Sequence, residues 1–375
     1  MNKFNNSIWI NAGEASGDMH GAMLARELVK RDPGLRIMGM GGSDMEKAGC
    51  ELHYSMQMIN LVGFTEVFPK LPSLLRLFGK IKSVWKRERP KCVVLIDCPD
   101  FNFRLARIAH GLGIPVYYYI TPQIWAWRQG RAEFLKKYAR KILCILPFEQ
   151  QFFKDRGVDA TYVGHPLMDI IPLSDLDALE PDPNLVGILP GSRSREISSL
   201  LPEFAKAAEM LAGEFPDLHF SIARAPGVRE EKLRSFWPER LPVTICGPDE
   251  RYRMMRRSNV IMAASGTATL ECALIGTPTL VAYRMAPLTA FLAQKVIKVK
   301  YVSLANIIPD RLILPEFLLH NATAENFFEQ VRQWVAEPHT ASAVRSELSE
   351  LREMLGAPGV ASRTADAILE DLHSI

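Results

Sequence analysis

The chain has 375 residues, 48% of them hydrophobic and 23% charged, and its net charge is +3. This length predicts two domains with a core each, and the ordinary composition excludes a disordered chain. Because the net charge is small, any attraction to anions must come from local clusters, and we expect no nucleic-acid partner. The six cysteines lack a CxxC pair, which is typical of buried thiols in a reducing compartment. No stretch resembles a signal peptide or a membrane span, so we expect a soluble or peripheral cytoplasmic protein.

Short strand-like runs alternate with amphipathic stretches of helical length, which predicts an α/β fold built from βαβ units. Several runs are apolar throughout, as in parallel strands that are covered on both faces. The strands expected in the first half are residues 7–12, 36–41, 92–97, 115–120, 141–146 and 160–164. Those expected in the second half are residues 185–191, 219–224, 242–247, 259–265 and 278–283.

A segment rich in proline and acidic residues, 169–184, interrupts this alternation and is the expected linker. It separates an N-terminal domain, 1–168, from a C-terminal domain, 185–322, and the tail 323–375 has only helical patterns. We therefore expect two doubly wound, Rossmann-like domains facing a cleft, with ligands at the carboxyl ends of the strands.

Acidic residues follow two expected strands of the N-terminal domain. "NAGEASGD" places Glu14 on a loop with two glycines, and "VVLIDCPDFNF" places Asp97 at the end of an apolar strand. A carboxylate at the carboxyl end of such a strand is well placed to act as a general base. We assign that role to Asp97, and we assign the capping of the following helix to Asp100 or Asn102.

The segment 67–91 combines a broad apolar stripe with an almost purely basic opposite face. Packing of the helix in a core would explain such a stripe. A helix that lies on anionic lipid, or that receives an acylated anionic substrate, would explain it equally. Both interpretations stay open, and different parts of the stripe can serve each. The stripe consists of Leu71, Leu74, Leu75, Phe78, Ile81 and Trp85, widened by Leu77 and Val84, and the basic residues include Arg76, Lys80 and Arg87.

An aromatic cluster, "YYYITPQIWAWRQGR", begins in the expected strand 115–120. Core packing accounts for its three tyrosines. Trp125, Trp127 and Arg128 either pack in the same way or border a sugar or phosphate.

A glycine-containing loop follows the first strand of the C-terminal domain in "GILPGSRSREI". Gly191 permits a close approach of the backbone, Ser192 is suited to cap the next helix, and Arg193 has the fork of N–H groups that fits phosphate oxygens. The helix dipole disfavours cations at a helix start, so Arg193 and Arg195 at this position favour an anion site.

A second loop of this kind occurs in "AASGTATLE". Ser265, Gly266 and Thr267 offer N–H groups and hydroxyls at a helix N-terminus, which suits an anionic group. Glu271 is suited to accept hydrogen bonds from the two hydroxyls of a ribose, although an acid near a helix start is also favoured by the dipole alone. Two such loops in one domain predict a site for a nucleotide diphosphate.

The chain resembles the lipid-A-disaccharide synthases across nearly its whole length, and the joint occurrence of the motifs is highly specific. Coverage is weakest in the linker and in the final helices. The motifs, in chain order, are "AGEASGD", "IDCPDFN", "PQIWAWRQGR", "LPFE", "VGHPLMD", "LPGSRSREI", "ASGTATLECAL", "YRMAPLT" and "YVSLANII".

This resemblance implies a GT-B glycosyltransferase with two Rossmann-like domains, which inverts the anomeric carbon without a metal or cofactor. Its reaction joins UDP-2,3-diacylglucosamine to 2,3-diacylglucosamine 1-phosphate (lipid X), which releases UDP and forms the β-1,6-linked disaccharide of lipid A. The implied site has Asp97 as base for the acceptor 6-hydroxyl, Glu14 near the reacting sugars, Arg193 on the diphosphate, Ser265, Gly266 and Thr267 on the phosphates, Glu271 on the ribose and Asn306 completing the donor site.

The substrates carry acyl chains and phosphate, so an enzyme for them needs an apolar surface with cations around it. The residues expected on that acceptor- and membrane-facing surface are Leu74, Leu75, Phe78, Arg76, Lys80, Trp85 and Arg128. The resemblance further implies a peripheral protein on the anionic, cytoplasmic face of the inner membrane. It also implies a possible homodimer in which C-terminal segments are exchanged.

Three other interpretations compete with this one. A nucleotide-sugar epimerase or hydrolase on the same scaffold would share the phosphate loops but would need no acceptor. A non-catalytic peripheral protein that binds acylated phosphosugars would bind vesicles without releasing UDP. A dinucleotide-dependent dehydrogenase is disfavoured because no complete GxGxxG motif is present. No spacing of His, Cys and acidic residues resembles a metal site.

Overall fold

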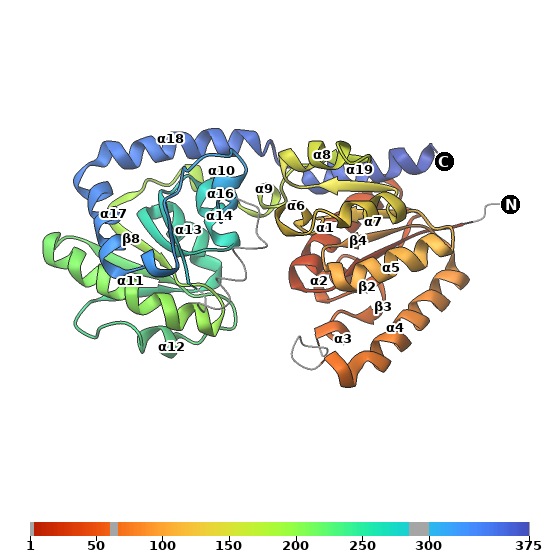
Figure 1. The fold of residues 1–375 in the computed structure, drawn as a ribbon, viewed down its shortest axis with the longest axis horizontal. Helices are drawn as coiled ribbons and strands as arrows, with labels where there is room; N and C mark the ends of the chain where they lie inside the picture. The colour runs from red at the N-terminus through yellow and green to blue at the C-terminus, as the bar shows by residue number, and fades with distance from the viewer. Residues whose placement is uncertain (1–3, 61–66, 285–299, 375) are drawn as a thin grey trace. The chain divides into compact units, whose positions relative to one another are not determined.

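The computed structural model of the chain describes residues 4–60, 67–284 and 300–374, and it leaves out the side chains of residues 60 and 67–71. The chain divides into two compact units (Figure 1). The N-terminal unit comprises residues 1–169 together with 357–375, and the C-terminal unit comprises residues 170–356.

A parallel sheet of seven strands forms the middle of the N-terminal unit, in the order β3-β2-β1-β4-β5-β6-β7. The central strands β1 and β4 are buried over most of their length, as expected of parallel strands that helices cover on both faces. The strands are β1 (Asn5–Ala12), β2 (Arg36–Gly41), β3 (Glu51–Ser55), β4 (Pro90–Ile96), β5 (Val116–Tyr119), β6 (Lys141–Cys144) and β7 (Ala160–Tyr162). The helices are α1 (Ala15–Arg31), α2 (Ser43–Lys47), α3 (Gln57–Asn60), α4 (Val67–Glu88), α5 (Pro99–Gly111), α6 (Ile124–Trp127), α7 (Arg131–Tyr138), α8 (Pro147–Lys154), α9 (Leu167–Ile170, which runs into the C-terminal unit) and α19 (Val360–His373).

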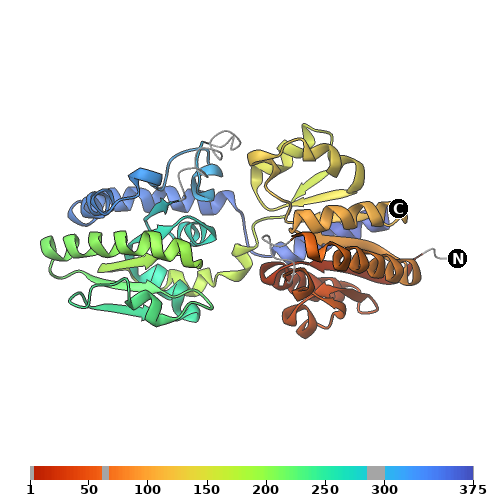
Figure 2. The same ribbon diagram turned by 60° about the horizontal axis from the view of Figure 1, so that its bottom comes forward.

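The C-terminal unit contains a second parallel sheet, in the order β10-β9-β8-β11-β12-β13. Helices α11 and α17 lie side by side (Figures 1 and 2). Their buried side chains share one hydrophobic core with those of β8, β9 and β11. The strands are β8 (Asp182–Leu189), β9 (His219–Ala223), β10 (Val243–Cys246), β11 (Ser258–Ala264), β12 (Thr279–Tyr283) and β13 (Glu316–Leu318). The helices are α10 (Leu173–Asp177), α11 (Ser194–Glu214), α12 (Glu230–Arg234), η1 (Pro248–Glu250), α13 (Arg251–Arg257), α14 (Thr267–Ile275), α16 (Leu304–Ile307), η2 (Leu319–Asn321), α17 (Ala324–Ala336) and α18 (Pro338–Met354).

The tail expected as one helical segment, 323–375, is shared between the two units. Helices α17 and α18 belong to the C-terminal unit, whereas α19 packs along α1 in the N-terminal unit. The Asp169 carboxylate accepts hydrogen bonds from the backbone N–H groups of Gly359 and Ala361, so it caps the start of α19. The guanidinium of Arg31 binds Asp366 and the hydroxyl of Ser362 on the same helix.

The two expected sets of strands agree with the sheets to within a few residues, but β3 and β13 were missed. Both lie at a sheet edge, where one side of the strand pairs with no other strand of the described residues. The sequence of β3, "ELHYS", is largely polar, and β13 has only three residues. Neither has the apolar run that marks a strand covered on both faces.

Candidate active site

Both sheets reverse their strand order at one point, and ligands of doubly wound proteins bind beside such a point at the carboxyl ends of the strands. In the N-terminal unit the reversal lies between β1 and β4, which pair directly. In the C-terminal unit it lies between β8 and β11. Each of these four strands ends in a motif singled out from the sequence, so each unit carries two candidate loops at its switch point.

Asp97 directly follows β4 and has a left-handed backbone with φ of 43°. Such a φ is uncommon for a residue with a Cβ and is found where neighbouring groups hold the backbone in place. The carbonyl oxygen of Asp97 accepts hydrogen bonds of 2.7 Å from Asn102 Nδ2 and from the Tyr118 hydroxyl. Asn102 Oδ1 in turn accepts a hydrogen bond of 2.8 Å from Asn11 Nδ2.

Asn102 was expected as a possible helix cap, and the structure corrects this expectation. Its side chain is fully buried and also donates to the carbonyl oxygen of Ile96. Asn102 therefore holds the turn that carries Asp97, a role that no sequence pattern distinguishes from capping.

The Asp97 carboxyl group has its pKa raised to about 6, chiefly because it is partly buried and secondly because of the negative charge of Glu14. Glu14 immediately precedes α1, is exposed, and accepts a hydrogen bond of 3.0 Å from the Ser16 hydroxyl. The loops after β1 and β4 lie close to each other. A Cβ added at Gly13 would lie only 2.7 Å from Cys98 Sγ. A carboxylate with a pKa near 6 is suited to accept a proton at neutral pH.

The aromatic segment after β5 contains one buried and one exposed tryptophan. Trp125 is buried and donates from Nε1 to Glu149 Oε1 at 3.0 Å. Burial raises the pKa of Glu149 to about 7, and its carboxylate also accepts the N–H groups at the start of α8. Trp127 is exposed, and the guanidinium of Arg128 lies 4.1 Å from the centre of its ring. Trp125 is therefore structural, whereas Trp127 and Arg128 form an exposed cationic and aromatic pair.

Part of the apolar stripe of α4 packs in the core, which corrects the expectation for two residues. Phe78 stacks on Phe101 with ring centres 4.8 Å apart, and Trp85 packs edge-on against Trp9 at 5.7 Å. Phe78 is almost fully buried and Trp85 fully so. They stabilise the N-terminal unit and do not face an acceptor or a membrane.

The outer face of α4 keeps the other expected residues. The Leu75 side chain is 58% exposed, and Arg76 and Lys80 are exposed beside it. Leu74 is half-buried, and the side chain of Leu71 lies outside the described residues. The exposed face of α4 is thus basic with an apolar residue on it.

The C-terminal unit has a cavity of about 470 Å³ at its switch point. Seven of the eight residues expected to bind the donor line it, and they come from the loops after β8 and β11 and from the helices that follow. These seven are Gly191, Ser192, Arg193, Ser265, Gly266, Thr267 and Glu271. Arg195 is exposed and is not among the residues that line the cavity.

Arg193 occupies the position before α11, and Glu196 supplies the cap. The backbone N–H groups of Ser192 and Arg193 donate to Glu196 Oε2 at 3.3 and 3.2 Å, so Ser192 is not the side-chain cap that was expected. Gly191 has φ of 96°, and a Cβ there would lie 2.7 Å from Glu196 Oε2. The turn therefore requires glycine. The side chain of Arg193 is 83% exposed, so its guanidinium is accessible.

Glu271 is buried in the wall of this cavity and is held by two residues that no sequence motif indicated. Its Oε1 accepts a hydrogen bond of 3.0 Å from the Tyr252 hydroxyl and lies 3.6 Å from a guanidinium nitrogen of Arg251. Burial, and secondly the charge of Glu271, raise the pKa of Tyr252 to about 12, so the hydroxyl stays a donor. The segment "DERYRMM" that supplies both residues has no phosphate-loop pattern, so nothing in it marks them as part of a site.

Asn306 does not line the cavity, which corrects the last expectation for the donor site. Its side chain is fully buried, and all of its hydrogen-bonding capacity is used within the unit. Nδ2 donates to the Leu314 carbonyl and to Glu316, and Oδ1 accepts from the N–H groups of Ile313 and Leu314. Asn306 thus orders its own loop. Residues 285–289 of the motif "YRMAPLT" lie outside the described residues.

Neither a metal centre nor a membrane span is found in the part of the chain that the structure describes. Among these residues, no group of three or more His, Cys, Asp and Glu side chains is arranged to hold a metal ion. Within the same ranges, no helix has the length and apolar character needed to cross a bilayer.

The sequence model of the family described as "Lipid-A-disaccharide synthetase" matches residues 8–367. A lipid-A-disaccharide synthase of Myxococcus xanthus is 36% identical over 371 residues, with 97% of each chain covered. Another, from Syntrophus aciditrophicus, is 37% identical over 366 residues, with 96% of each chain covered. The chain belongs to the lipid-A-disaccharide synthase family. The resemblance carried by the motifs is thereby confirmed, and with it a glycosyltransferase of lipid A biosynthesis.

Solved structures confirm the GT-B fold expected for this family. A UDP-GlcNAc 2-epimerase from Neisseria meningitidis bound to UDP-GlcNAc has a TM-score of 0.62 at 14% identity, covering 98% of this chain and 100% of its own. The glycotransferase of kitacinnamycin has a TM-score of 0.61 at 17% identity, and the match covers 97% of this chain and 98% of that one. At such identities the likeness concerns the fold alone, because one fold serves several reactions.

Proposed function

We propose that this member of the family transfers 2,3-diacylglucosamine from UDP to the 6-hydroxyl of lipid X, with inversion at the anomeric carbon and without a metal ion. The observation that carries the proposal is the partly buried Asp97 carboxyl group, whose pKa is raised to about 6, at the switch point of the N-terminal sheet. A positioned base is what the attack of a hydroxyl requires. Membership of the family supports the choice of substrates.

The C-terminal cavity binds UDP in this proposal. The N–H groups at the start of α14 and the guanidinium of Arg193 bind the diphosphate, and Ser192, Ser265 and Thr267 contribute hydroxyls. Glu271, held by Tyr252, accepts the ribose hydroxyls. These groups provide fixed positive charge for the negative charge that develops on departing UDP.

Asp97 acts on the acceptor. It takes the proton of the 6-hydroxyl while that oxygen forms a bond to the anomeric carbon of the donor sugar. The bond between this carbon and the diphosphate oxygen breaks, and its electron pair leaves with UDP. Glu14 raises the pKa of Asp97 and so strengthens it as a base.

The acylated substrates reach the enzyme from the cytoplasmic face of the inner membrane in this proposal. Leu75, Arg76 and Lys80 on the outer face of α4 provide an apolar contact and two cations for an anionic lipid surface, with Arg128 as a further cation of the same unit.

We further propose that a homodimer forms by exchange of C-terminal segments. The segment 357–375 contacts the N-terminal unit through specific pairs such as Arg31 with Asp366, and an exchanged segment would form the same pairs with a partner copy. The molar mass by light scattering tests this: a monomer at micromolar concentration contradicts it.

The decisive experiment measures UDP release from UDP-2,3-diacylglucosamine in detergent micelles containing EDTA, with and without lipid X. We expect release that requires lipid X and survives EDTA. Release that lipid X does not accelerate would indicate a hydrolase, and epimerised donor would indicate an epimerase. Folded protein that binds UDP without releasing it from the donor would contradict the proposed substrates.

A further inference from the structure

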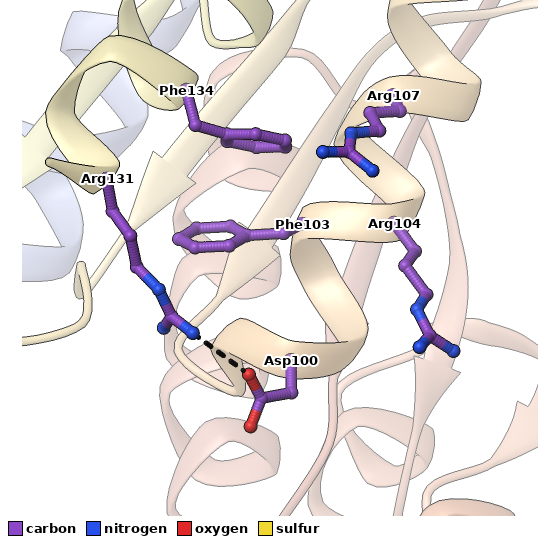
Figure 3. Close-up of a pocket in the computed structure, with 6 residues that line it drawn as sticks. All are labelled: Asp100, Phe103, Arg104, Arg107, Arg131 and Phe134. Carbon is purple, nitrogen blue, oxygen red and sulfur yellow. Dashed lines mark hydrogen bonds and ion pairs between the residues drawn. The ribbon is translucent and has the colours of Figure 1, made fainter. Parts of the chain in front are cut away.

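Three arginines and two phenylalanines line a separate cavity of about 420 Å³ on α5 and α7 of the N-terminal unit. Figure 3 shows Arg104 and Arg107 leaving successive turns of α5, while Arg131 comes from the start of α7. We call the six residues that line it the arginine pocket: Asp100, Phe103, Arg104, Arg107, Arg131 and Phe134.

Aromatic rings support two of the guanidinium groups of the pocket. Arg107 lies 5.0 Å from the centre of the Phe134 ring, and Arg131 lies 5.1 Å from that of Phe103. Figure 3 shows the two rings between α5 and α7, pointing toward these arginines. A guanidinium that stacks on a ring keeps the N–H groups in its plane available, and stacking limits the side-chain entropy lost on binding.

The positive charge of the pocket is only partly neutralised. Arg131 forms an ion pair of 3.2 Å with Asp100. Arg104 and Arg107 are exposed, and neither has a carboxylate partner or a hydrogen-bond acceptor among the residues that the structure describes. The pocket therefore carries a local charge of about +2 with free, forked donors, which is the arrangement that binds phosphate oxygens.

The two free arginines of the pocket lie further along α5 than its start beside Asp97, where Asp100 borders the pocket. Arg107 lies eight residues beyond Pro99, the first residue of α5, which is about 12 Å along the helix axis. The pocket also adjoins α4, because the guanidinium of Arg104 lies 5.7 Å from the ring of Phe78. Since α4 carries the exposed Leu75 and the cations proposed to contact lipid, the pocket continues that basic surface.

We propose that the arginine pocket is a binding site for the phosphate of an anionic phospholipid headgroup in the membrane. The proposal deepens the membrane attachment proposed above and rests on it. Arg104 and Arg107 bind the phosphate oxygens, while α4 contributes general attraction to the surface. The pocket thus gives the enzyme a specific contact with one lipid, in addition to a contact with average surface charge.

Vesicle binding by the full-length protein tests the proposal. We would measure co-flotation with phosphatidylcholine vesicles that contain phosphatidylglycerol, and with vesicles in which a fatty acid supplies the same surface charge without phosphate. The variant R104Q/R107Q is expected to bind the phosphatidylglycerol vesicles about 25-fold more weakly, since each cation near the surface contributes about fivefold. The affinity of the same variant for the fatty-acid vesicles is expected to fall by a smaller factor.

A control variant removes the same amount of positive charge from another helix, α1. R26Q/K30Q removes two exposed cations one turn apart on α1, which packs along α19, and it should bind within twofold of the wild type. Equal losses in the two variants, or equal losses on both kinds of vesicle, would overturn the phosphate site. Unchanged binding by R104Q/R107Q would also overturn it.

Turnover in neutral detergent micelles distinguishes this proposal from the proposed function. R104Q/R107Q should release UDP there at the wild-type rate, and a loss of turnover would mean that the arginines bind the acceptor, which overturns the lipid site. If the wild type binds vesicles through these arginines but transfers no sugar, the proposed function fails and the lipid site stands.

Discussion

The guanidinium of Arg193, the residue before α11, donates a hydrogen bond of 2.9 Å to Oε1 of Glu196 in the first turn of that helix. The other oxygen of that carboxylate accepts the backbone N–H groups of residues 192 and 193. This carboxylate therefore binds guanidinium N–H groups of Arg193, which we assign to the diphosphate of UDP. The diphosphate and Glu196 compete for these donors.

Replacing Glu196 with Gln should strengthen UDP binding. The amide oxygen of Gln keeps an acceptor for the start of α11, but the negative charge that competes with the diphosphate is removed. Because Arg193 is largely exposed, we expect a modest fall in the Kd of UDP, about threefold, measured by calorimetry. Glu214→Gln at the far end of α11 is the control and should leave the Kd unchanged. Weaker binding by Glu196→Gln would show that Glu196 orients Arg193 for the ligand.

Replacing Arg193 with Ala should lower turnover at least 100-fold, because fixed positive charge on the leaving diphosphate is lost. Arg195→Ala is a closely matched control. Arg195 is two residues further on and exposed, but it does not line the cavity, so its variant should retain activity within about twofold. Initial rates of UDP release compare the two. Similar losses of turnover in both variants would mean that the total positive charge at the start of α11 matters, and that Arg193 makes no specific contact with the diphosphate.

Strands buried on both faces could be predicted from the sequence where they contain a continuous apolar run, such as residues 92–96 of β4. Such a run is too short for a helix and is typical of a buried strand. The two loops that line the C-terminal cavity could be found because Gly191 and Gly266 interrupt the chain between a strand and a helix. Edge strands lack such runs. The return of α19 to the N-terminal unit depends on long-range pairs, such as Arg31 with Asp366, that no local pattern contains.

The functional side chains were harder to separate from structural ones. Phe78 and Leu75 both belong to the apolar stripe of α4, and only the packing of α4 on α5 shows that the first is buried and the second exposed. Asn306 is part of a motif of the family, but its contacts are all internal. Tyr252 holds Glu271 from a neighbouring helix, which is a relationship between residues 19 apart that sequence spacing does not reveal.

Glu14→Gln should shift the pH profile of the reaction. The negative charge of Glu14 is one of the causes that raise the pKa of Asp97 to about 6, so its removal lowers that pKa. The acid limb of the kcat/KM profile reports the pKa of the base in the free enzyme, so it should move below pH 6. The plateau rate should fall because the base is weaker. Profiles of UDP release between pH 5 and 8 measure both effects. Glu46→Gln, an exposed acid on α2, should leave the limb in place. An unmoved limb in Glu14→Gln would mean that Asp97 is not the group that titrates.

Asp97→Asn should abolish most activity but stabilise the fold. Loss of a general base costs about 10²- to 10⁴-fold in turnover, whereas UDP binding in the C-terminal cavity should be retained. The folded-state pKa of Asp97 lies about two pH units above its ordinary value of 3.8, chiefly through burial and secondly through Glu14. Keeping the carboxylate charged in the folded protein therefore lowers the free energy of unfolding by about 3 kcal/mol at pH 7.5. Asn carries no charge and adopts the left-handed backbone of this position more readily than Asp.

Because the pKa of Asp97 is raised in the folded state, the stability that its carboxylate costs depends on pH. A carboxyl group with a raised folded-state pKa costs stability fully above pH 6, and this cost declines toward zero below pH 3.8, where both states are protonated. The gain in Asp97→Asn, measured by denaturant unfolding, should therefore shrink by about half between pH 7.5 and pH 5. Asp100→Asn, three residues further on with a side chain that is 72% exposed, should show no comparable gain at either pH. A destabilised Asp97→Asn that also loses UDP binding would make Asp97 a structural residue, and the proposed base would have to be sought elsewhere.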